Sequence, residues 1–469
     1  MIKQFKKSLI ILSVIILAFS ANTFAVTKGA DVVYSEVAEE KGLTLGLASR
    51  ELFNYRSEIA WPDGPEIDAE GAYLVEINTG SVLYSKSFNQ QFYPASITKI
   101  LTALVVIENC DDLDEMVTFS KNAVHDIEEG GFSWICEVGD QLSVRDCLYA
   151  LMLHSSNECA YALAEHFGGS IQGFTSMMNE KAKEVGAYNS NFANPHGLTN
   201  PDHVTTPHDM ACIMWAAIQN PVFLKIDSTV TYRTAPTTTN PEGFFCNMRH
   251  SMMRNTDYHD DRVIAGKTGY ISAAKNTLVT YAKDGDKELI AVVMRTNGTG
   301  QACIDTKKLL DYGFNSFEIT PVPSGVELDA LKSEISQKAT DLAIEGVSYD
   351  DTIDIIHPKN SSVPELKWSM ELSDSNEGSA ERKGEITFFL GEKVVAKRDV
   401  SVSFIQPASQ EESRETLPDT SAPEISSSKT ILIVILSVAA AALIATAVIF
   451  IKISSRPKTR EKGTSRRKK

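Results

Sequence analysis

The chain has 469 residues, of which 43% are hydrophobic and 23% are charged. This length exceeds that of one ordinary domain, and the composition is that of a globular protein, which excludes a largely disordered chain. The formal net charge is −16 at pH 7 although both ends of the chain are basic, so the body between them is more acidic still. An acidic body argues against nucleic acid as a partner.

The first 25 residues have the layout of a secretory signal peptide. Three lysines precede an apolar run, residues 9–19, and a stretch of small residues ends at Ala25. The run is short for a membrane span, so cleavage after Ala25 is favoured over an uncleaved anchor. Residues 26–62 show weak periodicity and are expected to form a leader.

The other end of the chain predicts a membrane anchor. Residues 406–429 are rich in Ser, Pro and Glu, which is typical of a flexible stalk. Residues 430–451 form an uncharged run of 22 residues, and residues 452–469 carry nine Lys or Arg and one Glu. The run is long enough to cross a bilayer, and a positive flank stays on the cytoplasmic side, which explains the tail better than nucleic-acid binding does. Both ends therefore predict a single-pass membrane protein with an extracytoplasmic body.

The hydrophobic pattern predicts two folded domains, residues 63–318 and 319–405. In the first, it predicts in chain order a hairpin (72–77 and 81–84), helices (96–109, 144–153, 158–167, 174–185 and one from 210), three strands (263–270, 277–282 and 289–294) and a closing helix (304–317). This order predicts an antiparallel sheet made from both ends of the domain, with a helical insertion and helices on both faces. The second domain is expected to be small and β-rich.

Three short motifs lie in the first domain where the predicted structure changes. Ser-x-x-Lys occurs five times, but only Ser96–Lys99 opens an apolar helical segment. Ser155–Asn157 lies in a polar break between two predicted helices, and Lys267–Gly269, the single Lys-Thr-Gly, lies on a predicted strand. The order and context of the three motifs, more than any one match, separate them from chance occurrences.

Together these motifs predict nucleophilic catalysis by a serine. A serine hydroxyl is a weak nucleophile unless a base lies within hydrogen-bond reach, and on a helix Lys99 shares a face with Ser96. Partial burial and a second cation, Lys267, would lower the pKa of Lys99 toward neutrality, so that it can act as the general base. Ser155 can relay a proton to the leaving amine, and Asn157 can bond both Lys99 and the substrate amide.

Each residue also has a structural interpretation. Taken alone, Ser96 would be a helix cap, Lys99 a surface lysine and Lys267 a strand charge. Their joint order and context favour the catalytic interpretation. Within the same set, Gly269 would let substrate backbone lie flat against the strand as an added β-strand.

No metal or cofactor is indicated. His154, His196 and His203 lack a ligand spacing such as His-x-x-Glu-His, and a structural role is favoured for the last two. The seven cysteines include no Cys-x-x-Cys pair. Cys147 and Cys159 lie in apolar helical stretches, which predicts core positions for both.

The motifs, written YPASITK, HSSN and GKTGY, resemble those of the penicillin-binding proteins and serine β-lactamases. Longer stretches such as NPHGLTNPDHVTTPHDMA and KKLLDYGF make residues 67–317 similar to the low-molecular-mass D-alanyl-D-alanine carboxypeptidases. This resemblance implies the α/β (α+β) fold of that superfamily and removal of the terminal D-alanine from peptidoglycan stem pentapeptides. It also implies that β-lactam antibiotics inhibit the protein covalently and that no metal is required.

The resemblance also assigns roles to individual residues. Ser96 would attack the carbonyl between the two terminal D-alanines, and the backbone N–H groups of Ser96 and Tyr270 would form the oxyanion hole. Lys267 and Thr268 would bind the substrate, with Thr268 holding its terminal carboxylate. Water would then hydrolyse the acyl-enzyme.

Three positions depart from the family pattern. Ala302 stands where an arginine usually assists carboxylate recognition, and Arg295 is the hypothesised substitute. Ser156 stands where glycine is common, and Lys275 where a small residue is typical. The first departure bears on substrate affinity rather than on the acylation chemistry.

Rival functions use the same residues. A D,D-endopeptidase would need the same catalytic set, whereas a β-lactamase is disfavoured because no clear deacylating glutamate motif lies between Ser155 and Lys267. A non-catalytic sensor of β-lactams or of the cell wall is weakly favoured by Ala302 and disfavoured by the intact Ser96 and Lys99.

Overall fold

A computed structural model describes residues 44–45, 61–125, 136–321, 344–348, 354–361, 367–372 and 381–404. The predicted signal peptide, most of the leader, the stalk, the apolar run 430–451 and the basic tail lie outside these residues. Among the described helices, none has the length and apolar character that a bilayer crossing needs.

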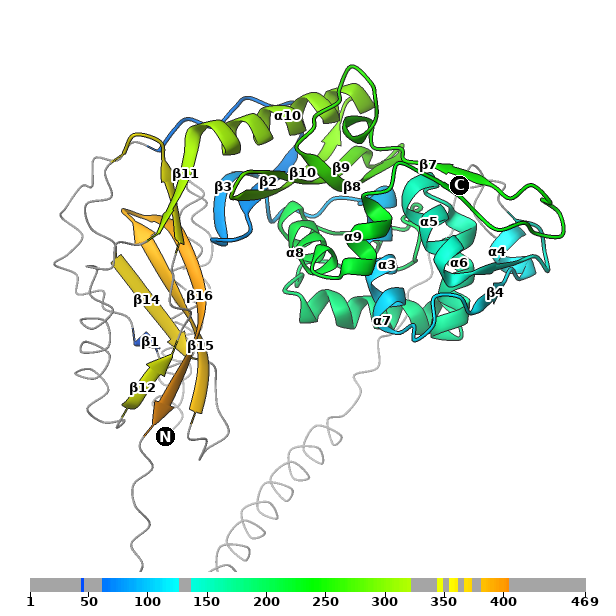
Figure 1. The fold of residues 1–469 in the computed structure, drawn as a ribbon, viewed down its shortest axis with the longest axis horizontal. Helices are drawn as coiled ribbons and strands as arrows, with labels where there is room; N and C mark the ends of the chain where they lie inside the picture. The colour runs from blue at the N-terminus through cyan, green and yellow to red at the C-terminus, as the bar shows by residue number, and fades with distance from the viewer. Residues whose placement is uncertain are drawn as a thin grey trace, which may run out of the picture. The chain divides into compact units, whose positions relative to one another are not determined.

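Residues 71–296 contain a five-stranded antiparallel sheet with the strand order β3-β2-β10-β9-β8. Its strands are β2 (Gly71–Glu76), β3 (Ser81–Lys86), β8 (Val263–Ile271), β9 (Lys275–Asp284) and β10 (Lys287–Thr296). The two N-terminal strands lie beside three strands from much later in the chain (Figure 1). The predicted hairpin, the three strands and the sheet made from both ends of the domain are confirmed.

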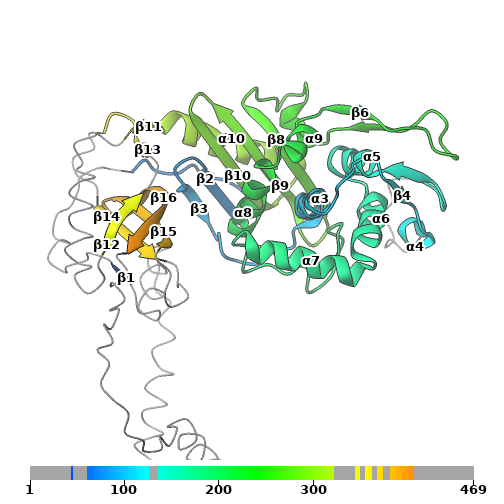
Figure 2. The same cartoon turned by 60° about the horizontal axis from the view of Figure 1, so that its bottom comes forward.

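Helices cover both faces of this sheet, as predicted. Helix α10 (Thr299–Ser316) packs against β9 and β10 on one face, and α8 (Pro207–Ile218) packs against β2, β9 and β10 on the other (Figures 1 and 2). The central strands β2 and β10 are buried at nearly every position, because side chains on both of their faces meet a helical layer.

The helical insertion lies between β3 and β8. Its helices are α3 (Lys99–Glu108), α4 (Lys121–His125), α5 (Val144–Tyr149), α6 (Asn157–Gly168), α7 (Ile171–Glu184), α8 and α9 (Pro221–Asp227). Several begin at a capping side chain, as where Ser170 accepts a hydrogen bond from the Gly173 N–H. Cys147 and Cys159 are fully buried in α5 and α6, which confirms their predicted core positions.

Some short elements were not predicted. They are α4, α9 and two small hairpins, β4–β5 (Met116–Thr118 and Gln141–Ser143) and β6–β7 (Thr231–Arg233 and Phe245–Asn247). These strands have three residues each and the helices five and seven, so none is long enough to show a clear hydrophobic period.

The region after α10 is β-rich, as expected. Strand β11 (Phe317–Pro321) pairs with β13 (Asp354–Pro358), and a second sheet has the order β1-β14-β15-β16-β12. Its strands are β1 (Thr44–Leu45), β12 (Ile344–Ser348), β14 (Lys367–Leu372), β15 (Glu381–Leu390) and β16 (Lys393–Phe404). The turn between β15 and β16 lies at Gly391 and Glu392.

Candidate active site

Ser96 and Lys99 meet at the start of the helical insertion. Ser96 lies in a 3-10 turn, η2 (Ala95–Thr98), which runs directly into α3, so the predicted single helix 96–109 begins with a tighter turn. Residues three apart nearly eclipse in a 3-10 turn, which brings the two side chains together. The Lys99 Nζ lies 3.0 Å from the Ser96 Oγ.

Lys99 is fully buried, and its amine has two further partners. Its Nζ donates hydrogen bonds to the Asn157 Oδ1 at 2.7 Å and to the backbone oxygen of His196 at 2.6 Å. A neutral amine has two N–H donors and one lone pair. The two oxygens use both donors, and the lone pair is then free to accept the proton of the Ser96 hydroxyl.

Burial is the main reason why a neutral Lys99 is favoured. Removal from water lowers the pKa of Lys99 well below its ordinary value, and the positive charge of Lys267 lowers it further. Glu158 opposes this shift more weakly. An amine that is unprotonated near neutral pH can act as a general base.

Ser155 is held in an unusual backbone conformation. A π-helical turn, η3 (Ala150–His154), follows α5, and Ser155 then adopts φ +66° before α6 begins at Asn157. The predicted break between two helices therefore contains a left-handed residue, a conformation that non-glycine residues adopt rarely. Ser155 accepts a hydrogen bond from the Lys267 Nζ at 3.0 Å.

Lys267 lies on β8 and is almost completely buried. Its Nζ also donates to the Thr268 backbone oxygen at 3.1 Å. Burial lowers the pKa of Lys267 to about 7, against the opposing charge of Asp227. At neutral pH this second lysine is therefore poised between its two charge states.

Gly269 brings strand β8 close to the backbone of Ser96. A Cβ atom at Gly269 would lie 2.8 Å from the Ser96 N and 2.5 Å from the Thr277 Oγ1. No side chain fits in such a space, so the glycine is needed for the close approach. Tyr270 follows on the same strand with an exposed side chain, and the predicted oxyanion donors, the backbone N–H groups of Ser96 and Tyr270, thus belong to adjacent segments.

The structure brings all eight predicted site residues into one region. Ser96 is linked through Lys99 to Asn157, Ser155 is linked to Lys267, and β8 at Gly269 closes against the Ser96 backbone. Among the described residues, no group of three or more His, Cys, Asp or Glu side chains has a geometry that would hold a metal ion.

The sequence profile of the D-alanyl-D-alanine carboxypeptidases, peptidase family S11, matches residues 58–298. The chain belongs to this family. Membership makes it a serine-type carboxypeptidase, a hydrolase, with a penicillin-binding-protein-like α/β fold.

Individual relatives support the assignment. The D-alanyl-D-alanine carboxypeptidase DacF of Bacillus subtilis is 27% identical over 74% of this chain and 85% of its own length. A D-alanyl-D-alanine endopeptidase of Escherichia coli is 30% identical over 60% of this chain and 87% of its own. A solved structure of a variant of the Streptomyces K15 DD-transpeptidase matches with a TM-score of 0.50 and 30% identity over 53% of this chain and 99% of that one.

One of the family departures has a structural explanation in this carboxypeptidase. The Ser156 Oγ accepts a hydrogen bond from the Cys159 N–H at 3.1 Å and donates to the Glu158 Oε2 at 2.9 Å, so this serine caps α6 where a glycine would leave the helix end uncapped. Lys275 adopts φ +55° at the start of β9 and pairs with Glu70 at 3.3 Å.

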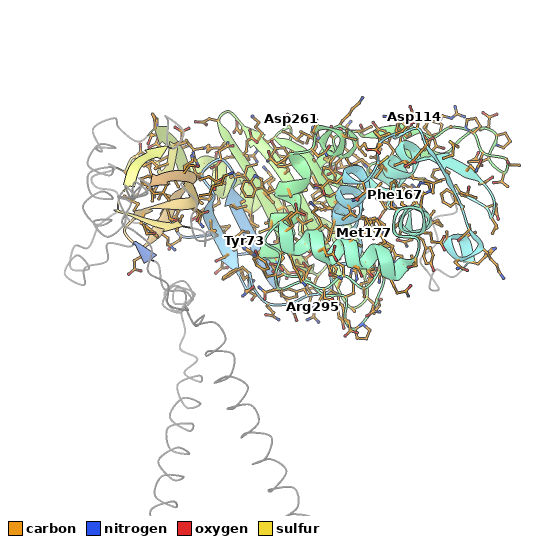
Figure 3. The ribbon with its side chains drawn as sticks, turned by 90° about the horizontal axis from the view of Figure 1, so that it is seen from below. Tyr73, Asp114, Phe167, Met177, Asp261 and Arg295 are labelled. Atoms are coloured by element: carbon orange, nitrogen blue, oxygen red, sulfur yellow. The ribbon has the colours of Figure 1, made fainter. Side chains whose placement is uncertain are left out.

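The remaining departure is Ala302, which stands in place of an arginine. Ala302 is buried in α10. Arg295, the hypothesised substitute, lies at the edge of the described molecule with a half-exposed side chain (Figure 3), and its Nη1 is 3.2 Å from the Glu70 Oε2. Arg295 therefore already forms an ion pair, with a carboxylate that it shares with Lys275.

His196 and His203 contact the segment that carries Ser96 and Lys99. His203 Nδ1 accepts from the Ala193 N–H at 3.0 Å, so its Nε2 donates to the Thr98 Oγ1 at 2.8 Å. Burial lowers the pKa of His203 to about 3, which keeps it neutral. These contacts agree with the predicted structural role of His203. The backbone oxygen of His196 accepts a hydrogen bond from Lys99, a contact that a side-chain motif cannot predict.

Two charged residues near the site were not predicted, Asp227 and Arg249. Asp227 ends α9 fully buried, and no side chain in the described part of the chain forms a hydrogen bond with its carboxylate. Burial raises the pKa of Asp227 to about 7, although the charge of Lys267 and the Gly266 N–H oppose this. Neither residue belongs to a recognisable motif, and only the folded chain brings them beside Lys267.

Proposed function

We propose that this carboxypeptidase removes the terminal D-alanine from peptidoglycan stem pentapeptides through an acyl-enzyme on Ser96, and so limits cross-linking of the cell wall. The observation that carries the proposal is the 3.0 Å contact between the Ser96 Oγ and the buried amine of Lys99. A nucleophile beside a base whose pKa is lowered is the arrangement that acyl transfer needs.

In the first half-reaction the Ser96 hydroxyl gives its proton to the Lys99 Nζ and the Ser96 Oγ bonds to the carbonyl carbon of the penultimate D-alanine. The developing oxyanion accepts hydrogen bonds from the Ser96 and Tyr270 N–H groups. The proton held by Lys99 passes to Ser155 as Ser155, bonded to Lys267, gives its own proton to the nitrogen of the terminal D-alanine. The C–N bond breaks, and Lys99 is left neutral again.

In the second half-reaction a water molecule replaces the departed D-alanine. Lys99 takes a proton from this water, whose oxygen attacks the ester carbonyl, and the proton returns to the Ser96 Oγ as the acyl bond breaks. Asn157 keeps the amine in place through its 2.7 Å bond, while Thr268 and Gly269 hold the substrate along β8. β-Lactams acylate the same oxygen because they imitate the D-Ala-D-Ala end.

The proposal is tested with fluorescent penicillin and a D-alanine release assay on the purified protein, with Ser96→Ala as the control. Labelling together with release of D-alanine from a pentapeptide is expected, and both are lost in the control. Labelling without release would instead support a non-catalytic sensor, and the absence of labelling would contradict both.

A second candidate is a D,D-endopeptidase, because one relative with that name is 30% identical to the chain. The same catalytic residues would cleave a cross-link instead of a free peptide end. Cross-linked muropeptide dimers separate the two activities: faster cleavage of dimers than of pentapeptide would favour the endopeptidase.

The proposed location is the outer face of the cell membrane, with a single span at residues 430–451. The signal-like first 25 residues and the basic tail, residues 452–469, support this topology. A protease added to intact protoplasts should remove the catalytic domain and leave a short membrane fragment. A catalytic domain that resists the protease until the cells are lysed would contradict the topology.

A further inference from the structure

The terminal carboxylate of a D-Ala-D-Ala peptide needs a cation, and the usual family residue is absent. Ala302 provides no charge, and the Arg295 guanidinium is already paired with Glu70 at 3.2 Å. Glu70 also binds Lys275, so the Arg295 guanidinium is already held by an ion pair within a local network of three charges.

The two lysines of the site are poor substitutes. Lys99 has to lose its proton to act as a base, and its pKa lies well below the ordinary value. Burial lowers the pKa of Lys267 to about 7, so its charge is incomplete at neutral pH. A guanidinium, in contrast, keeps its proton under all physiological conditions.

Arg249 is such a group, and it lies next to both lysines. It stands between β7 and a 3-10 turn, η4 (Ser251–Met253). Its Nη2 lies 3.4 Å from the His154 Nε2, and its charge lowers the pKa of Lys99, of Lys267 and of His154.

Among the described residues, no carboxylate forms an ion pair with Arg249. Its Nη2 lies 3.4 Å from the His154 Nε2, and partial burial lowers its pKa with no carboxylate acting in the opposite direction. Burial and the Arg249 charge both lower the pKa of His154, against the weaker effect of Glu158. In the described part of the chain Arg249 is therefore a partly exposed cation without an ion pair.

We propose that Arg249 binds the terminal carboxylate of the substrate, together with Thr268 and Ser155, and thereby replaces the arginine that Ala302 removes. Its position supports this assignment: it contacts His154, the residue before Ser155, and the Lys267 Nζ joins the Ser155 Oγ to the Thr268 backbone at 3.0 and 3.1 Å. The inference rests on the proposed carboxypeptidase function and adds the residue that makes the enzyme select a free peptide end.

The chemistry favours arginine in this position. A guanidinium can donate two parallel N–H bonds to one carboxylate, which fixes the end of the peptide in a single orientation. The contact also discriminates against substrates without the charge, because an amide or ester in the same place would leave the cation unpaired.

The test compares two substrates, a diacetyl-L-lysyl-D-alanyl-D-alanine peptide and its C-terminal amide, in wild type, Arg249→Ala, Arg249→Lys and Arg295→Ala. For Arg249→Ala, the ratio of kcat/KM on the free acid to kcat/KM on the amide should fall about tenfold or more. Loss of the Arg249 charge also raises the pKa of Lys99, but this change acts on both substrates and leaves the ratio unaffected. Arg249→Lys should restore part of the preference, and Arg295→Ala should keep the wild-type preference.

Acylation rates with benzylpenicillin and its methyl ester give a second readout of the same preference, which does not depend on amide turnover. The inference is overturned if Arg249→Ala keeps the wild-type preference, or if it loses acid and amide activity equally, as a purely structural role through His154 would predict. Either result leaves the carboxypeptidase function standing as long as Ser96 is still labelled and D-alanine is still released.

Discussion

Two regions of this molecule bury a lysine beside a second lysine, and only one of them is built for catalysis. In the active site Lys99 lies near Lys267, and at the C-terminal end of α10 Lys287 lies near Lys359. Burial is the main cause of the lowered pKa of both Lys99 and Lys287, and in each case the neighbouring lysine lowers it further.

The partners of the two amines differ. Lys287 donates to the backbone oxygens of Phe314 and Phe317, the latter at 2.8 Å, so it satisfies carbonyls at the end of a helix. Lys99 donates to two oxygens as well, but its third neighbour is a hydroxyl, the Ser96 Oγ. A buried amine with a lowered pKa can act as a general base only where a neighbouring group, here the Ser96 hydroxyl, can give it a proton.

The largest expected effect comes from removing the two lysines in turn. Lys99→Met should slow acylation by labelled penicillin by about 10²–10⁴-fold, the usual range for loss of a general base. Lys287→Met should leave the acylation rate near that of wild type, while unsatisfied carbonyls lower the free energy of unfolding by about 1–3 kcal/mol. Equal loss of acylation in both variants would remove the distinction between the regions.

The next test concerns the backbone that closes the catalytic region. In Gly269→Ala the new Cβ would meet the Ser96 N at 2.8 Å, which should displace β8 and disturb the oxyanion donors. We expect acylation about 10²-fold slower. Circular dichroism and the melting temperature show whether the fold persists, and normal acylation in a folded variant would contradict the close approach.

The third test uses Asp227, the buried carboxyl group beside Lys267. With a pKa of about 7 in the folded chain and an ordinary value of 3.8, this carboxyl keeps its proton in the folded state after the unfolded chain has lost it. Between these two pH values the folded state binds more protons, so stability falls as pH rises.

Asp227→Asn removes this titration. Relative to wild type, the variant should therefore gain stability between about pH 4 and pH 7 and show no further relative gain above that range. Urea unfolding at several pH values measures the difference. Wild-type and variant curves that run parallel across this range would show that Asp227 is not protonated preferentially in the folded state.

The smallest expected effect is at the start of α6. Ser156→Ala removes the cap that accepts the Cys159 N–H at 3.1 Å, and should lower the free energy of unfolding by about 1 kcal/mol. Because Ser155 and Asn157 keep their own partners, acylation should change little. A loss of acylation much larger than the loss of stability would mean that the cap also positions the catalytic residues.

The sequence predicts the catalytic set because the relevant residues are local. Ser96 and Lys99 are three positions apart, Ser155 and Asn157 flank a helix start, and Lys267 lies on a strand with a clear period. For the same reason the sheet and the longer helices are predicted correctly, since each shows its own hydrophobic pattern.

Residues whose role depends on distant segments are not predictable in this way. Asp227 ends a seven-residue helix, and Arg249 lies in a connection without periodicity, so nothing local marks either as a neighbour of Lys267. The π-helical turn that sets the conformation of Ser155 is equally hidden, because one extra residue in a helix leaves the apolar pattern almost unchanged.

The central claim is that Lys99 is unprotonated beside Ser96 at neutral pH, and NMR of protein labelled at the lysine ε-carbons tests it most directly. A titration of the Lys99 signal, assigned by its loss in Lys99→Met, should show a pKa well below the ordinary value of 10.5. A Lys99 signal that remains that of a charged amine up to its ordinary pKa would contradict the account.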